Sequence, residues 1–259
     1  MRSTILRHVL RFGALLSLFA PILALAGEPV TLHTRDGGAV FGTFTPASES
    51  GGKILLLFHQ ARASRHEYDP LIPAFNRLGF DTLAIDQRSG GDLFGGHNET
   101  VAKRGASTGY LDARPDLEAT LAWARARQYA TIVIVGSSYS SSLVLLLAAK
   151  HPEGVSAVAS FSPGEYFADK HRVKRAAAKI RMPLYITTDP AEEVRVNEVL
   201  RDAHGANITR YRPSAGVHGA STLVCARDPQ GCEANLRSFE TFLRKIGGKP
   251  AQPHRGTQP

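Results

Sequence analysis

The chain has 259 residues, of which 43% are hydrophobic and 21% are charged. This composition is that of a globular protein with a sizeable core, and it excludes a disordered chain, a collagen-like chain and a polytopic membrane protein. The formal net charge is +8, and the two cysteines are too few for a disulfide-dense scaffold or a four-cysteine zinc site.

The first 26 residues have the features of a cleavable secretory signal. Three arginines precede an apolar run over residues 12–25, and Ala24-Leu25-Ala26 has the small-x-small form of a cleavage site. The run is shorter than the ~20 residues that span a bilayer, and Pro21 interrupts it. We therefore expect cleavage after Ala26, a periplasmic or secreted protein, and no stable membrane insertion once the signal is removed.

The densest basic stretch, residues 172–181, contains five lysines or arginines. It could favour an anionic substrate or an anionic membrane surface. Aromatic side chains do not interleave with these charges, as they would in a platform for single-stranded nucleic acid. We therefore interpret the stretch as a solvated helix face and expect no nucleic-acid partner.

Between residues 27 and 246, apolar β-rich runs alternate with helical patterns. Strands are predicted as a hairpin within 29–46 and then at 53–59, 80–86, 131–136, 155–161, 183–188 and 208–212. Helices are predicted within 67–79, at 115–128 and 138–150, and from about residues 192 and 233. This alternation predicts one α/β domain with a mostly parallel sheet of about eight strands. Residues 247–259 lack periodic apolar residues and are predicted to be a flexible tail.

A buried strand runs directly into a helix through Gly136-Ser137-Ser138-Tyr139-Ser140. This is the context of a G-x-S-x-G nucleophile elbow, in which the central residue has a strained backbone and the residues two before and two after it must be small. Only Ser138 has small residues at both positions and lies at the apex of the turn. A helix cap alone needs one serine and does not explain the preceding glycine. We therefore predict that Ser138 is a nucleophile, although Ser140 replaces the usual last glycine.

A serine nucleophile needs a base. In proteins with a G-x-S-x-G elbow, the acid follows the serine in the chain and the histidine follows the acid. His151 lies at the far end of the helix that begins at Ser138, roughly 20 Å away at 1.5 Å per residue. His218 lies in a glycine-flanked loop after the last predicted strand and before the last helix. We therefore predict that His218 is the base, and that His59, at the end of a strand, has a structural role.

These segments together resemble the α/β-hydrolase superfamily, and most closely its small, uncapped, dienelactone-hydrolase-like group. The matching segments are FHQA at 58–61, AIDQRSGG at 84–91, GSSYS at 136–140, PLYITTDPAEE at 183–193 and GVHGAS at 216–221. Dienelactone hydrolases use a cysteine where this chain has Ser138, so their lactone substrate does not carry over. About 20 residues separate the predicted strands at 155–161 and 183–188, which is too few for a large lid domain.

The resemblance implies a third triad member and an oxyanion hole. Hydrolases of this type place the acid about where Glu192 lies, with Asp189 as the alternative and Glu165 and Glu193 as further candidates. The backbone N–H groups of Gln60 and Tyr139 are the expected oxyanion donors.

The sequence thus predicts a serine hydrolase that cleaves a small or medium carboxylic ester through an acyl-enzyme. A peptidase or amidase on the same fold, or a catalytically silent binding protein, are the alternatives. No cofactor and no metal are implied, because no zinc-type ligand cluster occurs. Cys225 and Cys232 are placed to close a small loop in an oxidising compartment, whereas the pattern does not indicate whether they are bridged or what the oligomeric state is.

Overall fold

Eight strands form one central sheet in the order β1-β2-β4-β3-β5-β6-β7-β8. The structure is a computed structural model that describes residues 27–205 and 207–248. β2 pairs antiparallel with β1 and β4, and the remaining neighbours are parallel. The strands are β1 Glu28–His33, β2 Ala39–Thr45, β3 Lys53–Phe58, β4 Asp81–Ile85, β5 Thr131–Ser137, β6 Ala157–Phe161, β7 Leu184–Thr187 and β8 Ile208–Arg210. The predicted mostly parallel sheet is therefore confirmed.

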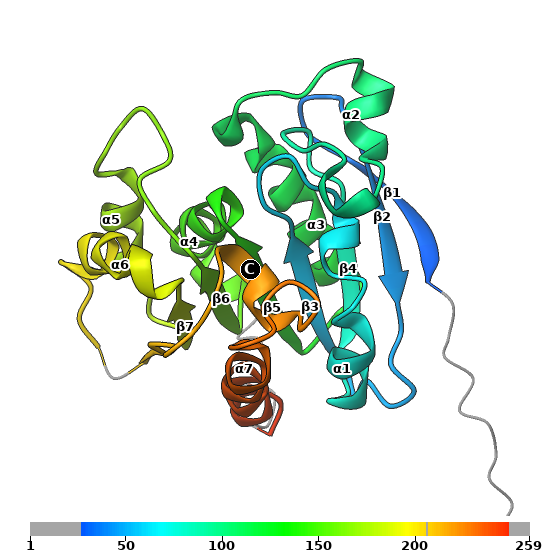
Figure 1. Ribbon diagram of the computed structural model, residues 1–259. Coiled ribbons are helices and arrows are strands. Elements are labelled where there is room, and N and C mark those ends of the chain that lie inside the picture. The colour runs from blue at the N-terminus through cyan, green and yellow to red at the C-terminus, as the bar shows by residue number, and fades with distance from the viewer. Residues whose placement is uncertain (1–26, 206, 249–259) are drawn as a thin grey trace, which may run out of the picture.

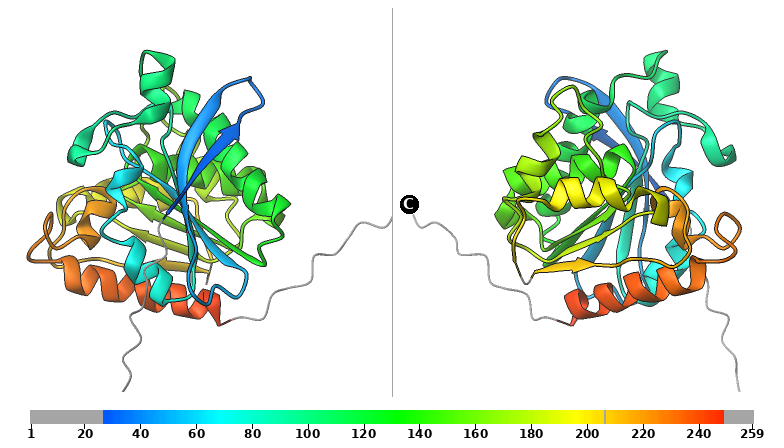
Figure 2. Two further views of the ribbon diagram at one scale, coloured as in Figure 1. Left: turned by 90° about the vertical axis from the view of Figure 1, so that its right-hand side faces the viewer. Right: turned by 60° about the vertical axis from the view of Figure 1, so that its left-hand side comes forward.

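Helices cover both faces of this sheet (Figure 1). They are α1 Ile72–Arg77, α2 Glu99–Arg104, α3 Arg114–Ala126, α4 Tyr139–Lys150, α5 Arg172–Ala177, α6 Glu193–Leu200 and α7 Cys232–Gly247. Figure 2 shows α1 and α7 on one side of the sheet, with α3 and α4 on the other. No large lid domain is present in the described residues, because the connection between β6 and β7 holds only the short helix α5.

The hydrophobic core consists of two clusters, one on each face of the sheet. One joins the sheet to α3, α4, α5 and α6, and the other joins it to α1 and α7. In the second cluster Phe239 lies edge-on to Phe75 and Phe161, with ring centroids 5.9 and 5.1 Å apart. All seven residues of β5 are buried, as expected of a β-branched central strand covered on both faces. Ser138 therefore follows a fully buried strand of the sheet.

Among the differences from the sequence prediction, one helix is new and another is longer. The helix α2 lies in a segment for which no element was predicted. The side chain of Asn98 caps it by accepting a hydrogen bond from the Val101 N–H at 2.8 Å, and Gly105 ends it with a φ of +84°. At the other end of the chain, α7 extends through Gly247, one residue into the predicted tail, and Gly248 follows it in a turn, whereas residues 249–259 lie outside the described part. The predicted signal at residues 1–26 lies outside it as well.

Candidate active site

Ser138 occupies the turn between β5 and α4, at the carboxyl edge of the sheet. Its backbone has φ 58° and ψ −123°, a conformation that residues with a Cβ rarely adopt. The Ser138 N–H donates to the carbonyl oxygen of Phe161 at 2.9 Å, which fixes the strained turn to the neighbouring strand. A Cβ added to Gly136 would lie 2.3 Å from the carbonyl oxygen of Ser140, so the predicted requirement for a small residue there is confirmed.

Ser140 stands where the elbow usually has glycine, and its hydroxyl is used. Its Oγ donates to the carbonyl oxygen of His59 at 2.6 Å and accepts from Gln87 Nε2 at 2.7 Å. The serine thus links the first turn of α4 to the ends of β3 and β4. The side chain is small enough for the turn and satisfies buried polar groups that a glycine would leave unpaired.

His218 reaches Ser138 from a loop that follows β8. Its Nε2 lies 2.8 Å from Ser138 Oγ. The loop is fixed on its far side by the N–H of Gly219, which donates to Ser162 Oγ at 2.9 Å. Gly219 has a φ of +74°, and an added Cβ would lie 2.4 Å from Ser137 Oγ, so a glycine is needed beside the histidine.

The other imidazole nitrogen contacts Glu192. His218 Nδ1 lies 2.7 Å from Glu192 Oε2, and Arg195 Nη1 donates to Glu192 Oε1 at 2.6 Å. Partial burial raises the pKa of the Glu192 carboxyl, but the hydrogen bond and charge of His218, together with Arg195 and the Thr188 hydroxyl, hold this pKa below its ordinary value. Glu192 is therefore an ionised acceptor that can orient the imidazole and stabilise its protonated form.

The other candidate acids are engaged elsewhere. Asp189, the alternative acid, accepts from the N–H of Ala191 at 2.8 Å and caps the short 3₁₀ helix Pro190–Glu192. Glu165 caps α5 by accepting from two backbone N–H groups, and Glu193 forms ion pairs with Arg210 and Arg212. The structure therefore brings Glu192, and not Asp189, to the histidine.

The two predicted oxyanion donors, the backbone N–H groups of Tyr139 and Gln60, differ in their hydrogen bonding. Tyr139 is the first residue of α4, where backbone N–H groups have no partner within the helix. The N–H of Gln60, in contrast, donates to Glu67 Oε2 at 2.6 Å. The expectation that Gln60 supplies an oxyanion donor is therefore wrong for this conformation, because a buried carboxylate seven residues later takes its only backbone proton.

His59 has the structural role that the sequence predicted. It is fully buried, its Nε2 accepts from the N–H of Gln87 at 2.9 Å, and its Nδ1 lies 2.8 Å from the carbonyl oxygen of Gln60. This arrangement requires a neutral ring with the proton on Nδ1. Burial, opposed by the Gln60 carbonyl and the charge of Asp86, lowers the pKa of His59 to about 4.

The chain matches the family described as serine aminopeptidase, S33, over residues 50–225, a range that contains Ser138, Glu192 and His218. The chain belongs to this family. The S33 family match and the fold together make the protein a member of the α/β-hydrolase superfamily, as the sequence resemblance implied. No curated protein matches the chain.

Solved structures similar to this S33 family member include several esterases. The esterase Pf2001 of Pyrococcus furiosus has a TM-score of 0.63 at 17% identity, and the match covers 87% of this chain and 92% of that one. A carboxyl esterase of Bacillus coagulans has a TM-score of 0.64 at 14% identity, covering 86% and 99%. A dienelactone hydrolase of Anabaena variabilis has a TM-score of 0.61 at 16% identity, covering 85% and 98%. At these identities the likeness establishes the shared fold.

Sequence reasoning missed two residues that lie close to the Ser138 turn of this S33 family member. The phenol of Tyr166 donates to the carbonyl oxygen of Ser162 at 2.8 Å and also contacts the Ser138 side chain. Burial raises the pKa of Tyr166, so the phenol stays protonated as a donor. Glu67 is the second and is fully buried. Neither residue lies in a motif, and only the folded chain brings them to the elbow.

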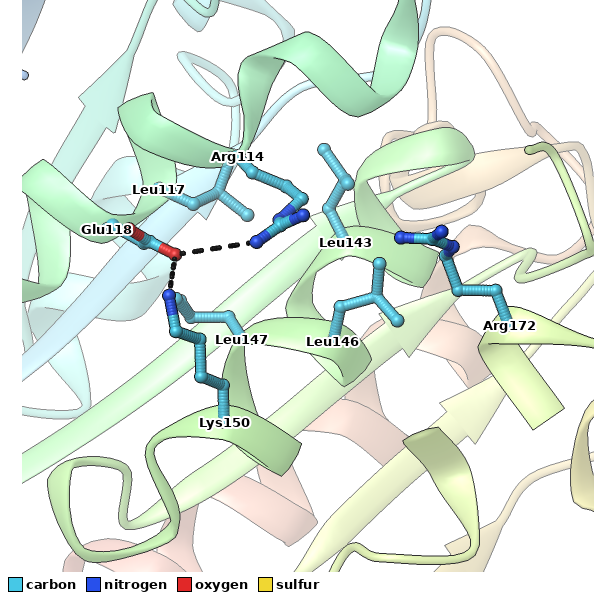
Figure 3. A pocket seen from close by; sticks show the side chains of 8 residues that line it. All are labelled: Arg114, Leu117, Glu118, Leu143, Leu146, Leu147, Lys150 and Arg172. Carbon is cyan, nitrogen blue, oxygen red and sulfur yellow. Dashed lines mark hydrogen bonds and ion pairs between the residues drawn. The ribbon is translucent and has the colours of Figure 1, made fainter. Parts of the chain in front are cut away.

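A separate pocket of about 210 Å³ lies between α3, α4 and the start of α5. Leucines from α3 and α4 line its floor, and Arg114, Lys150 and Arg172 lie at its rim (Figure 3). Lys150 and Arg114 both approach Glu118, at 2.7 and 4.0 Å. Ser138, Glu192 and His218 do not line this pocket, so it lies apart from their hydrogen-bonded contacts.

In residues 27–205 and 207–248, no group of three histidine, cysteine or acidic side chains is arranged to hold a metal ion. In the same part of the chain, no helix is both long and apolar enough to cross a membrane.

Proposed function

We propose that the protein hydrolyses a carboxylic ester of a small or medium acyl group through an acyl-enzyme. The observation that carries the proposal is the continuous hydrogen-bonded relay from Ser138 Oγ through the His218 ring to Glu192, with atom separations of 2.8 and 2.7 Å. Such a relay on a strained strand-to-helix turn is the arrangement that activates a serine hydroxyl. It also argues against a catalytically silent binding protein, which has no need of it.

In the proposed reaction, His218 Nε2 takes the proton from Ser138 Oγ as that oxygen attacks the ester carbonyl. Glu192 stabilises the imidazolium that forms. The tetrahedral intermediate collapses when His218 returns the proton to the leaving alcohol oxygen. Water then repeats the same proton transfers and releases the acid. We assign the oxyanion to the backbone N–H of Tyr139 and, because the N–H of Gln60 is engaged, to that of Ala61, the next residue in the loop.

An ester is favoured over the free amino terminus of a peptide by the charges at the site. An aminopeptidase needs an available carboxylate to bind the substrate ammonium group. Glu192 is already bound to His218, Arg195 and Thr188, and the Glu67 carboxylate accepts from Gln60 and Ser137. Neither carboxylate is available for an ammonium ion. The family description nevertheless keeps amide hydrolysis as the second candidate, and greater turnover of peptide anilides than of short acyl esters would establish it.

The test is covalent labelling with a fluorophosphonate. We expect the wild-type protein to be labelled and the Ser138→Ala variant to remain unlabelled. Ser142→Ala is the matched control, because Ser142 lies on the same helix but donates to the carbonyl oxygen of Gly164. Labelling of Ser138→Ala at the wild-type level would overturn the assignment. A panel of esters of increasing acyl length then defines the substrate range.

We further propose that the protein is exported and acts in the periplasm or outside the cell. The bridge between Cys225 and Cys232, whose Cα atoms lie 5.0 Å apart, supports an oxidising compartment. Mass spectrometry of protein recovered from its own cells should find a mature amino terminus at Gly27. An intact terminus at Met1 would contradict export by signal cleavage.

A further inference from the structure

Glu67 is a buried carboxylate that the proposed reaction does not use. It lies in the 3₁₀ helix Arg65–Glu67, in the connection after β3, and its side chain is fully buried. Its Oε2 accepts the N–H of Gln60 at 2.6 Å, and its Oε1 accepts the hydroxyl of Ser137 at 2.7 Å. One carboxylate thus joins the loop beside the oxyanion site to the residue immediately before the nucleophile.

A further hydrogen bond joins Ser137 to the loop that carries His218. Ser137 Oγ accepts the N–H of Ala220 at 2.8 Å, and Ala220 lies two residues after His218. Gly219, between them, packs so closely on Ser137 Oγ that a Cβ would lie 2.4 Å from this oxygen. The Glu67 carboxylate and the Ser137 hydroxyl therefore connect three segments that are far apart in the sequence and that all meet at the active site.

The hydrogen count at this cluster favours an ionised Glu67. Ser137 Oγ already receives the Ala220 N–H, so it gives its own proton to Glu67 Oε1. A protonated carboxyl would compete with that donor and leave one hydroxyl proton without its acceptor. The charged and titratable groups that face Glu67 are Arg227, Tyr68 and Tyr139. Burial raises the pKa of Glu67 to about 7, opposed by the Gln60 N–H, the Ser137 hydroxyl and the charge of Arg227, so the carboxylate form predominates above neutral pH. Arg227 Nη1 donates to the carbonyl oxygen of Glu67 at 2.8 Å.

We propose that Glu67 is a positioning residue, whose carboxylate holds the oxyanion loop, the nucleophile turn and the histidine loop in the mutual arrangement that allows Ser138 and His218 to react. The role rests on the proposed hydrolase function. It acts through Gln60 and Ser137 and requires no contact between Glu67 and the substrate. Holding the reacting groups in place raises the rate, because a displacement of about 1 Å can slow a reaction roughly 100-fold.

The experiment compares Glu67→Gln with a matched control in the full-length mature protein. Asp81→Asn is suited to this, because Asp81 is also a buried carboxylate that accepts one backbone N–H, from Ala47, and one hydroxyl, from Tyr129, both at 2.7 Å. Asp81 begins β4, at the sheet edge opposite Ser138. Both amide variants keep the side-chain shape and remove the charge. The value of kcat is calculated per active site titrated by a fluorophosphonate, so that unfolded protein is excluded from the enzyme concentration.

For Glu67→Gln we expect kcat to fall about 10- to 100-fold while KM changes less than about twofold, because the arrangement of the reacting groups is lost and ground-state binding is kept. Ser137→Ala, which cuts the link to Ala220 but keeps the Gln60 contact, should show a smaller fall in kcat. Asp81→Asn should lose thermal stability and keep its kcat.

A kcat for Glu67→Gln within threefold of the Asp81→Asn value would overturn the positioning role. So would a KM that rises in proportion to the loss of kcat/KM with kcat unchanged. Failure of the wild-type protein both to label and to turn over any ester would instead overturn the proposed hydrolase function, and the two failures are therefore distinguishable.

Discussion

Glu192 and His218 lie 26 residues apart in the chain, yet Oε2 of the first is 2.7 Å from Nδ1 of the second. This contact fixes the ring so that Nε2 faces Ser138. The Glu192→Gln variant should keep the packing but favour the wrong imidazole tautomer. We expect kcat to fall roughly 10³- to 10⁴-fold with little change in KM.

Steady-state ester hydrolysis measures the Glu192→Gln effect, and Glu193→Gln is its control. Glu193 is the next residue in the chain, but it forms ion pairs with Arg210 and Arg212. This variant should keep kcat within a few-fold of the wild-type value. Equal losses in the two variants would contradict the assignment of Glu192 as the orienting acid.

The steric demand of the nucleophile turn gives a second prediction. In Gly136→Ala the new methyl group would lie 2.3 Å from the carbonyl oxygen of Ser140, which is backbone and cannot move without shifting α4. We expect the free energy of unfolding to fall by about 1–3 kcal/mol or more, the range for an overpacked core. Chemical denaturation measures this, with Gly247→Ala as the control, since its nearest atoms would lie at an ordinary 3.4 Å. Equal stability of the two variants would contradict the packing argument.

The buried imidazole of His59 predicts a pH dependence of stability. Its pKa in the folded protein is about 4, below the ordinary 6.5, so between these values the unfolded chain binds a proton that the folded chain excludes. The free energy of unfolding is therefore unaffected by the protonation of His59 above about pH 6.5. It falls as the pH is lowered toward 4, by about 3 kcal/mol in total.

Imidazole nitrogen chemical shifts measured by NMR can follow this residue directly. The His59 ring should remain neutral, with its proton on Nδ1, from pH 8 down to about pH 5. A His59 signal that titrates near pH 6.5 in the folded protein would contradict the buried hydrogen-bonded arrangement.

The disulfide between Cys225 and Cys232 closes a short loop between the histidine segment and the start of α7. Removing such a cross-link should lower the free energy of unfolding by about 2–3 kcal/mol, the loop-entropy value for a separation of seven residues. Denaturation of the Cys225→Ser, Cys232→Ser double variant measures the loss against the oxidised protein. Unchanged stability would mean that the loop is held by its other contacts, such as Arg227 over the ring of Phe94 at 3.8 Å.

Local patterns were sufficient to predict most of the fold and two of the three residues of the proposed triad. The run at 131–136 is apolar and β-branched because it is covered on both faces, and the elbow that follows permits only small residues around Ser138. His218 followed from its place in a glycine-flanked loop after the last predicted strand, once His151 was excluded by its distance along the helix. Each inference depends on neighbouring residues, whose geometry short-range stereochemistry constrains. The helix α2 was missed because polar residues surround its cap at Asn98 and no apolar periodicity marks it.

The choice of acid and of the oxyanion donor depended on contacts between distant residues. Three carboxylates follow β7 within a few residues, and only the packing of the β8 loop against them brings Glu192 to His218. Gln60 follows its strand as predicted, but the direction of its N–H is set by Glu67. The sequence by itself determined which segments reach the carboxyl edge of the sheet, because strand and turn patterns are local. The tertiary structure decided which atoms meet there, because a hydrogen bond is set by a few tenths of an ångström and by the competition of every donor and acceptor within reach.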